Sequence, residues 1–517
     1  MTRKAMKRLY EGAEWDFETL QRIHDACEKI AVNELGLNVY PNQIEVITAE
    51  QMLDVYSSIG MPLFYKHWSF GKHFAHHEAF YRRGLRGLAY EIVINSSPCI
   101  SYLMEENTAT MQALVIAHAA FGHNHFFKNN YLFKLWTDAE GILDYLNFAK
   151  SYIARCEERY GPAAVERTLD AAHALMSHGV HRYAGKKKLD LRQEEVREQQ
   201  RRENEERIFN DLWRRTVPKG PAKSKPDLNA EHRRAMIGLP QENILYFLEK
   251  TAPRLRPWQR EILRIVRHMA QYFYPQGQTK VMNEGTATYV HYRIMSTLHE
   301  RGGIGDGDFL EFLKSHTNVV FQPGFDDPRY SGLNPYAIGF AMMQDIERIV
   351  TRPQKEDREW FPEIAGTGDA MAVLRDLWAN YRDESFVTQF LSPSLMRRMR
   401  LFHLTDDPEE EEGMRVAAIH DERGYRRIRR ELGRQYDIGW IDPHIEVVDV
   451  DLEGDRRLFL RHLVLSGSVL EEGDAKRVLQ HLADLWTYDV VLEECDRSGM
   501  LLKQHVVSPR ESVVAAA

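Results

Sequence analysis

The segment Val281-Met-Asn-Glu-Gly-Thr-Ala-Thr-Tyr-Val-His291 combines an apolar, small-residue run with one carboxylate and one imidazole. It belongs to a helix that its periodicity predicts over 283–299. Glu284 and His291 are seven residues apart, close to two α-helical turns, so they share a face. Ala287 and Thr288, which lie between them, are small and leave space over that face. Because a carboxylate is costly to bury unpaired, the segment indicates a cationic or metal partner for Glu284.

A second segment, Ala117-His-Ala-Ala-Phe-Gly-His-Asn-His125, places three histidines within eight residues. His118 and His125 share a face of an ideal helix, and we expect Gly122 between them to leave room for an ion or substrate. His123 is five residues from His118 and reaches the same point only if the helix ends or bulges near Gly122. Two facing helices that each contribute ligands build metal sites in helical proteins.

Neutral imidazoles are the commonest nitrogen ligands of zinc, iron and manganese. We therefore predict a divalent metal, with zinc as the first candidate, bound by His118, His123, Glu284 and His291. The metal would polarise an amide or ester carbonyl and lower the pKa of a bound water, with Glu284 and Glu91 as catalytic carboxylates. The alternative is that these histidines are hydrogen-bonded core residues, the commoner role of a single histidine on an apolar helix.

Further polar residues are candidates for supporting the ligands or for contacting a substrate. Asn283 can cap a helix N-terminus or hydrogen-bond a ligand. His73 belongs to a group with His76 and His77, which indicates an aromatic groove wall, with a plain surface helix as the alternative. The Asn-Pro-Tyr sequence at residue 334 is also typical of a helix start. The full set is His125, Asn283, His73, His316, Asn334 and Tyr336.

This arrangement resembles the zincin peptidases, in which a His-Glu-x-x-His helix supplies two ligands and a later Asn-Glu-x-x-Ala helix supplies the third. Asn283-Glu-Gly-Thr-Ala287 matches the second element. In the first element Ala119 follows His118, so the usual general base is absent, and the histidine spacing is one residue longer. The departure affects peptidase chemistry more than metal binding, because ligands and base are separate requirements. Glu91 and Glu78 are the candidates for a base from elsewhere in the chain.

The whole chain has 517 residues, 43% hydrophobic and 28% charged, with a formal net charge of −8. This balance disfavours nucleic-acid binding, which calls for a concentrated positive surface. No apolar run approaches the roughly 20 residues that cross a bilayer, and the basic start lacks the apolar region of a signal peptide. The four cysteines lie far apart with no Cys-x-x-Cys pair, which fits a reducing cytoplasm.

These patterns predict a mainly α-helical protein, with a large helical domain that holds zincin-like paired metal-ligand helices and a small C-terminal α+β module. The helical core covers 1–400 and includes a charged helix and a Pro/Lys-rich linker at 186–230. An acidic, proline-containing run makes 401–413 a linker. Alternating apolar segments separated by a hairpin signal place the α+β module at 414–507. Residues 508–517 are predicted to be a disordered tail.

Seven sequence blocks occur in order along the chain: Tyr65-Lys-His-Trp-Ser-Phe-Gly-Lys, Glu91-Ile-Val-Ile-Asn, the stretch from His118 to Asn130, Trp136-Thr-Asp-Ala, Tyr272-Phe-Tyr-Pro-Gln, Asn283-Glu-Gly-Thr-Ala-Thr and Asn334-Pro-Tyr-Ala-Ile-Gly-Phe. Together they resemble the stage V sporulation protein R (SpoVR) family over nearly the whole length. The glutamate block of that family more often reads Asn-Glu-Gly-Trp-Ala. Thr286 is therefore a departure, which removes an aromatic wall without changing Glu284.

The resemblance implies a cytoplasmic bacterial protein, associated with cortex peptidoglycan in spore formers and with stress and stationary-phase physiology elsewhere. It also implies a PrkA-type serine protein kinase and a von Willebrand-like protein as partners. No settled activity comes with the family, so the hypothesis of a metal-dependent hydrolase rests on the site residues. Peptidoglycan precursors or their peptides are the substrate class that the family suggests. The competing hypothesis is a non-catalytic regulatory or scaffold protein of the kinase system.

Overall fold

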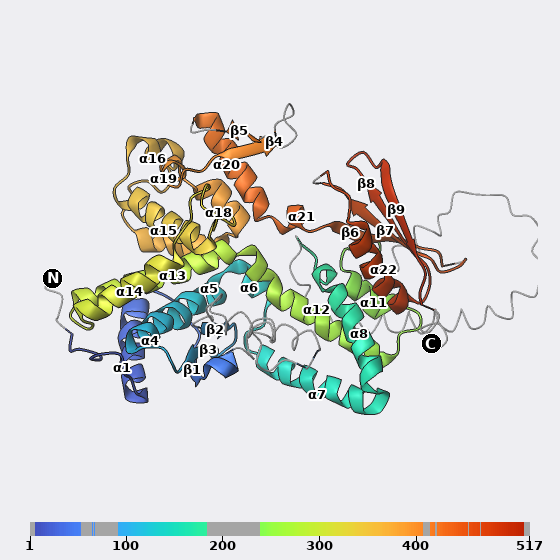
Figure 1. The fold of residues 1–517 in the computed structure, drawn as a ribbon, viewed down its shortest axis with the longest axis horizontal. Helices are drawn as coiled ribbons and strands as arrows, with labels where there is room; N and C mark the ends of the chain where they lie inside the picture. Colours follow the sequence, from blue (N-terminus) through green and yellow to red (C-terminus); the bar gives the residue numbers. More distant parts are fainter. Residues whose placement is uncertain are drawn as a thin grey trace, which may run out of the picture.

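The computed structural model describes residues 6–52, 65, 67, 91–182, 238–406, 414–418, 421–452, 454–465 and 467–510. The fold is mainly helical with a small sheet near the C-terminus, as predicted from the sequence. In Figure 1 this sheet lies at one end of the molecule and most of the helices lie at the other. His73, the charged segment at 186–230 and most of the acidic run lie outside the described residues.

Helices form most of the described chain, and none of those described combines the length and apolar character needed to span a membrane. The α-helices are α1 Phe17–Glu28, α4 Ala109–Val115, α5 Asn124–Asn129, α6 Tyr131–Trp136, α7 Ile142–Tyr160, α8 Pro162–Ala174, α11 Ile244–Thr251, α12 Pro257–Gln278, α13 Lys280–Glu300, α14 Asp306–Val319, α15 Pro335–Thr351, α16 Lys355–Trp360, α17 Ala370–Asn380, α18 Asp383–Phe390, α19 Pro393–Arg398, α20 Glu422–Gln435, α21 Ile438–Ile441 and α22 Glu472–Trp486. Two π-helices, η1 Lys29–Glu34 and η2 Ile116–His123, and the 3₁₀-helix η3 Met176–His178 complete them.

The strands in the described ranges form three separate sheets. The first has the order β1-β3-β2, with β1 parallel and β2 antiparallel to β3, and the second is the β4–β5 hairpin. The third has the order β6-β7-β8-β9, and its parallel pair β7–β8 is connected through α22. The strands are β1 Asn42–Ile47, β2 Glu91–Ile94, β3 Cys99–Met104, β4 His403–Asp406, β5 Met414–Ala418, β6 His444–Val450, β7 Leu458–Leu463, β8 Val490–Cys495 and β9 Leu501–Val507.

The helix α13 crosses the centre of the helical region and packs against η2 on one side and α15 on the other. Glycines allow both approaches. A Cβ atom on Gly122 would lie 2.5 Å from the Cα of Ala287, and one on Gly285 would lie 2.6 Å from the Cα of Gly339. The expectation that Gly122 leaves room for a ligand is therefore wrong. The backbone of α13 fills that space. The small residues thus let the two helices approach closely, and the longer side chains of both helices meet around this contact.

The segment η2 has the π-helical hydrogen-bonding pattern over Ile116–His123. One π-helical turn joins residue i to residue i+5, whereas an α-helical turn joins i to i+4. His118 and His123 are five residues apart and therefore project on the same side, as the sequence required of a bulged helix. The expected alignment of His118 with His125 holds only for an ideal α-helix, and the π-helical turns remove it.

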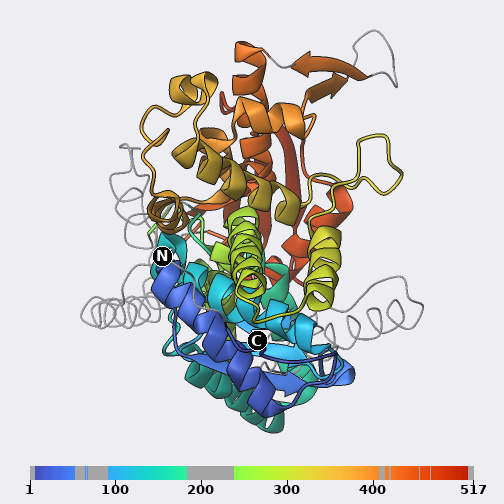
Figure 2. The ribbon, with the colours of Figure 1, turned by 90° about the vertical axis from the view of Figure 1, so that its left-hand side faces the viewer.

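The helix α20 and the hairpin before it pack with the helical region, whereas the sheet β6–β9 follows only from His444. Tyr425, Ile428 and Leu432 of α20 belong to the same hydrophobic core as η2 and α13. The structure thus places the change from helical region to sheet about thirty residues after the acidic run. In Figure 2 the β4–β5 hairpin and the N-terminal helices lie at opposite ends of the molecule.

Candidate functional site

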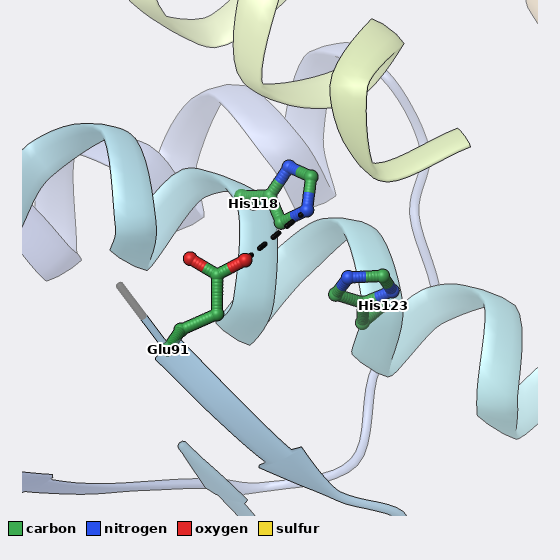
Figure 3. A group of neighbouring side chains, drawn as sticks. All are labelled: Glu91, His118 and His123. Atoms are coloured by element: carbon green, nitrogen blue, oxygen red, sulfur yellow. Dashed lines mark ion pairs between the residues drawn. The ribbon is translucent and has the colours of Figure 1, made fainter. Parts of the chain in front are cut away.

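Four side chains from three elements converge beside the contact between η2 and α13. Glu91 comes from β2, His118 and His123 from η2, and Glu284 from α13. The Nε2 atom of His118 lies 3.3 Å from Oε1 of Glu91 and 3.9 Å from Oε2 of Glu284, and Nε2 of His123 lies 3.5 Å from the same Oε2. Figure 3 shows Glu91 reaching up from its strand toward the two imidazoles. We call these four residues the central cluster.

The central cluster is enclosed on its histidine side and partly open on its carboxylate side. The imidazoles of His118 and His123 are 4% and 8% exposed, whereas the carboxylates of Glu91 and Glu284 keep 19% and 17% exposure. Nε2 of His118 and Oε2 of Glu284 are buried, yet neither makes a hydrogen bond with the part of the chain that the structure describes. Buried polar atoms are nearly always paired, so two orphaned electron-pair donors that face each other fit a cation between them.

The imidazole of His123 is held in place through Nδ1, the ring nitrogen that does not face Glu284. Nδ1 of His123 lies 2.9 Å from Oδ1 of Asn283, and because a carbonyl oxygen accepts, this Nδ1 carries the proton. The lone pair of His123 is then on Nε2 and faces Glu284. The N-cap of α13 is Thr279 and not Asn283. Of the two roles that the sequence suggested for Asn283, the hydrogen bond to a histidine is therefore the one seen in the structure.

Two further histidines lie behind His118. Nδ1 of His118 is 2.8 Å from Nδ1 of His291, and Nε2 of His291 is 2.9 Å from Nδ1 of His316. Both ring nitrogens of His291 are thus engaged by other histidines. The structure places His291 behind a candidate ligand, while Glu91, which the sequence suggested as a base, stands within 4.8 Å of the ligand atoms of both cluster histidines.

Burial controls the protonation of these groups. Burial, and then the charge of Glu284, raises the pKa of Glu91 to about 8. Burial together with the neighbouring imidazoles lowers the pKa of His118 and of His291 well below the usual value for histidine. Burial also lowers the pKa of His316 to about 4. Near neutral pH these three histidines are therefore uncharged, the form in which an imidazole binds a metal.

The remaining predicted site residues are not part of the central cluster. His125 points to the other side of its helix, where Nδ1 contacts the backbone of Asn38 and the ring packs edge-on against Trp378. Asn334 caps α15 by accepting a hydrogen bond from the backbone of Tyr336. The ring of Tyr336 lies parallel to that of His118, with centroids 6.5 Å apart, at the edge of the cluster.

Sequence reasoning missed Asp383, which positions the start of the helix that bears Glu284. Its carboxylate oxygens accept hydrogen bonds of 2.7 Å and 2.8 Å from the backbone amides of Val281 and Met282. Burial raises the pKa of Asp383 to about 7 despite these hydrogen bonds. The sequence carries no local signal for this cap, because about one hundred residues separate the carboxylate from the amides that it satisfies.

The fold and the central cluster define a mainly helical protein with a buried histidine–carboxylate site between two close-packed helices. The chain belongs to the SpoVR family: residues 14–441 match the family described as SpoVR like protein, and residues 443–497 match the SpoVR-like C-terminal domain. It is 52% identical over 498 residues to the uncharacterized protein YcgB of Escherichia coli (strain K12), covering 96% of each chain. The comparison with solved structures gave no match.

Proposed function

We propose that this SpoVR family member is a metal-dependent hydrolase that uses zinc to cleave an amide or ester bond. The ligands are His118, His123 and Glu284, and Glu91 carries protons between water and the leaving group. The observation that supports the proposal most is the pair of orphaned atoms, Nε2 of His118 and Oε2 of Glu284, which face each other across the central cluster.

The spacing of the donor atoms supports a single ion. Two ligands at about 2.1 Å from zinc are about 3.0 Å apart at a right angle and about 3.4 Å apart at the tetrahedral angle. The separation of 3.5 Å between Nε2 of His123 and Oε2 of Glu284 is close to the tetrahedral value. The 3.9 Å between Nε2 of His118 and Oε2 of Glu284 is longer and would correspond to a wider angle.

The local structure also accounts for the departure from the zincin pattern. Two histidines four residues apart share a face of an α-helix, and two histidines five residues apart share a face of a π-helix. The extra residue between His118 and His123 is thus compatible with a pair of zinc ligands. Ala119 supplies no base. Glu91, which lies on a strand, instead approaches Nε2 of His118, the nitrogen proposed to bind the metal.

The reaction follows from these positions. When bound, zinc would supply a water of lowered pKa and would polarise the carbonyl of the substrate. Glu91, in its ionised form, would take a proton from the water that attacks the carbonyl carbon. The bond from carbon to the leaving nitrogen or oxygen then breaks as Glu91 returns the proton to the leaving atom. The ring of Tyr336 beside His118 gives the substrate an apolar wall.

Membership of the SpoVR family supports peptidoglycan-derived peptides as the first substrates to test, in sporulation or stress physiology and in the cytoplasm. A PrkA-type kinase and a von Willebrand-like protein are partners under this proposal. The alternative is a non-catalytic protein that works with the same kinase, in which the metal would be structural.

The proposal is tested by zinc content and by hydrolysis of stem peptides followed by mass spectrometry. The wild-type protein should hold one zinc, and His123→Ala should lose it, whereas His125→Ala, a buried histidine two residues away, should keep it. Glu91→Gln should retain zinc and lose hydrolysis. Zinc-free wild-type protein would contradict the metal site, and full hydrolysis by Glu91→Gln would contradict the catalytic role. Zinc binding with no hydrolysis of any peptide would favour the non-catalytic alternative.

A further inference from the structure

Three buried histidines from three different helices are hydrogen-bonded in series. His118 belongs to η2, His291 to α13 and His316 to α14, and the three residues are 3%, 1% and 5% exposed. The two contacts, 2.8 Å and 2.9 Å, are between ring nitrogens, so one nitrogen in each must donate and the other must accept. The series leads from the central cluster to the packing layer between α13 and α14.

Only one proton arrangement of the three neutral rings leaves Nε2 of His118 free to bind a metal. Nδ1 of His118 must then donate to His291, whose own proton is on Nε2. That proton is donated to Nδ1 of His316, which carries its proton on its outer nitrogen. The opposite arrangement puts a proton on Nε2 of His118, facing Glu91, and blocks the metal. The direction of this series therefore decides whether His118 can act as a ligand.

The packing around the last ring fixes it in place. The ring of His316 lies edge-on to Phe340, with centroids 4.8 Å apart, and packs against Tyr292 at 5.1 Å. His291 in turn lies edge-on to Phe312. The rings of Phe312 and Phe340 offer the histidines no hydrogen-bond acceptor, whereas His118 also has a backbone hydrogen bond with Ala287.

We infer that His291 and His316 are positioning residues that act in series, fixing the orientation and the tautomer of His118 so that its Nε2 faces the metal. The inference rests on the proposed metal site and adds to it, since it assigns the two histidines to a role behind the ligand. Outer partners of this kind typically change metal affinity by about 10–100-fold when they are removed. An asparagine at position 291 can place its carbonyl oxygen where Nδ1 of the histidine was and still accept from His118.

The test measures zinc affinity of the full chain by competition with a chromophoric chelator. We expect His291→Leu to weaken zinc binding about 10–100-fold and His291→Asn to recover most of that loss. His316→Leu should weaken binding when His291 is present and have no further effect in the His291→Asn background, because the series is then already interrupted. The thermal unfolding of each zinc-free variant reports damage to the packing separately.

The outcomes separate this inference from the proposed function. If the wild-type protein binds no zinc, both fall. If the wild-type protein binds zinc and both leucine variants bind it equally well, only the positioning role is overturned. A loss in His291→Asn as large as that in His291→Leu would also overturn it, since a lost acceptor would then not be the cause. Equal losses from His316→Leu in both backgrounds would show that the two histidines do not act in series.

Discussion

Within its described residues, the protein has two buried clusters of histidine and glutamate that differ in how completely their atoms are hydrogen-bonded. In the sheet cluster, Glu494 of β8 accepts from His462 at 2.9 Å, from His505 at 2.8 Å and from the backbone amide of Leu470 at 2.8 Å. In the central cluster the corresponding separations are 3.3–3.9 Å, and Oε2 of Glu284 has no hydrogen-bond partner. Similar side chains thus make a closed hydrogen-bonded network in one region and an open set of ligands in the other.

The protonation of the carboxylates follows the same division. Burial raises the pKa of Glu494, but the hydrogen bonds from His505, Leu470 and His462 outweigh it, so the net pKa is lowered. Glu91 has no such donors, and its pKa is raised to about 8. A carboxylate that is fully satisfied by the protein stabilises the fold, whereas one that still needs a partner is available for a ligand or a proton.

The sharpest way to separate the two clusters is to make the same substitution in each. Glu284→Gln should abolish stoichiometric zinc binding with little loss of stability, because it removes a charge that the protein leaves unpaired. Glu494→Gln should leave zinc binding unchanged and destabilise the fold by about 1–3 kcal/mol, since it breaks a satisfied buried network. Zinc titration and urea unfolding of both variants check this. Equal loss of stability in both would remove the distinction between the clusters.

The next largest effect is expected where the helices of the central cluster touch. Gly122→Ala should cost about 1–3 kcal/mol of unfolding free energy, because its Cβ would meet the backbone of Ala287 at 2.5 Å. It should also weaken zinc binding, since His118 and His123 lie on the displaced helix. The matched control is Gly307→Ala in α14, which has open space at its Cβ and should be neutral or slightly stabilising. A Gly122→Ala protein with unchanged stability would contradict the close approach.

A smaller effect is expected from pH. Below pH 8 the zinc-free central cluster holds a proton on Glu91. Because the charge of a bound zinc ion favours the ionised form of this neighbouring carboxylate, zinc affinity should rise by up to about tenfold per pH unit from 6 to 8. Stability of the zinc-free protein should change in the opposite sense. The pKa of Glu91 is raised above its ordinary value of 4.5. The contribution of this carboxyl group to the free energy of unfolding is therefore lost as the pH rises through 8. Zinc titrations from pH 6 to 8 check this, and Glu91→Gln should flatten the slope. An equal slope in that variant would assign the proton to another group.

Much of the central cluster could be predicted from the sequence, because its residues stand in local patterns. Glu284 and His291 do share a face of one α-helix, and both reach His118. The five-residue spacing of His118 and His123 called for a bulged helix, and a π-helix is present there. The short strand at Glu91 was also predictable from its β-branched residues. Each of these features depends on the geometry of a single element.

Other features depend on partners that are distant in the sequence. The prediction that His118 and His125 share a face was wrong, because the residue spacing in the sequence does not reveal that the helix has the wider turns of a π-helix. The role of Gly122 was also wrong, since the space over a glycine is open only until another helix is docked there. Strands β8 and β9 were not foreseen, because a strand within a packed module is defined by the strands beside it.

The sequence by itself determined the helical class, the family and the residues that carry imidazoles and carboxylates at helical spacings. Tertiary structure decided which of their atoms face one another. It turned Glu91 toward the cluster histidines, put His291 behind His118, and left Nε2 of His118 and Oε2 of Glu284 without hydrogen bonds. The physical reason is that periodicity assigns a side chain to a face of a helix, whereas only packing between helices and strands assigns its polar atoms to partners.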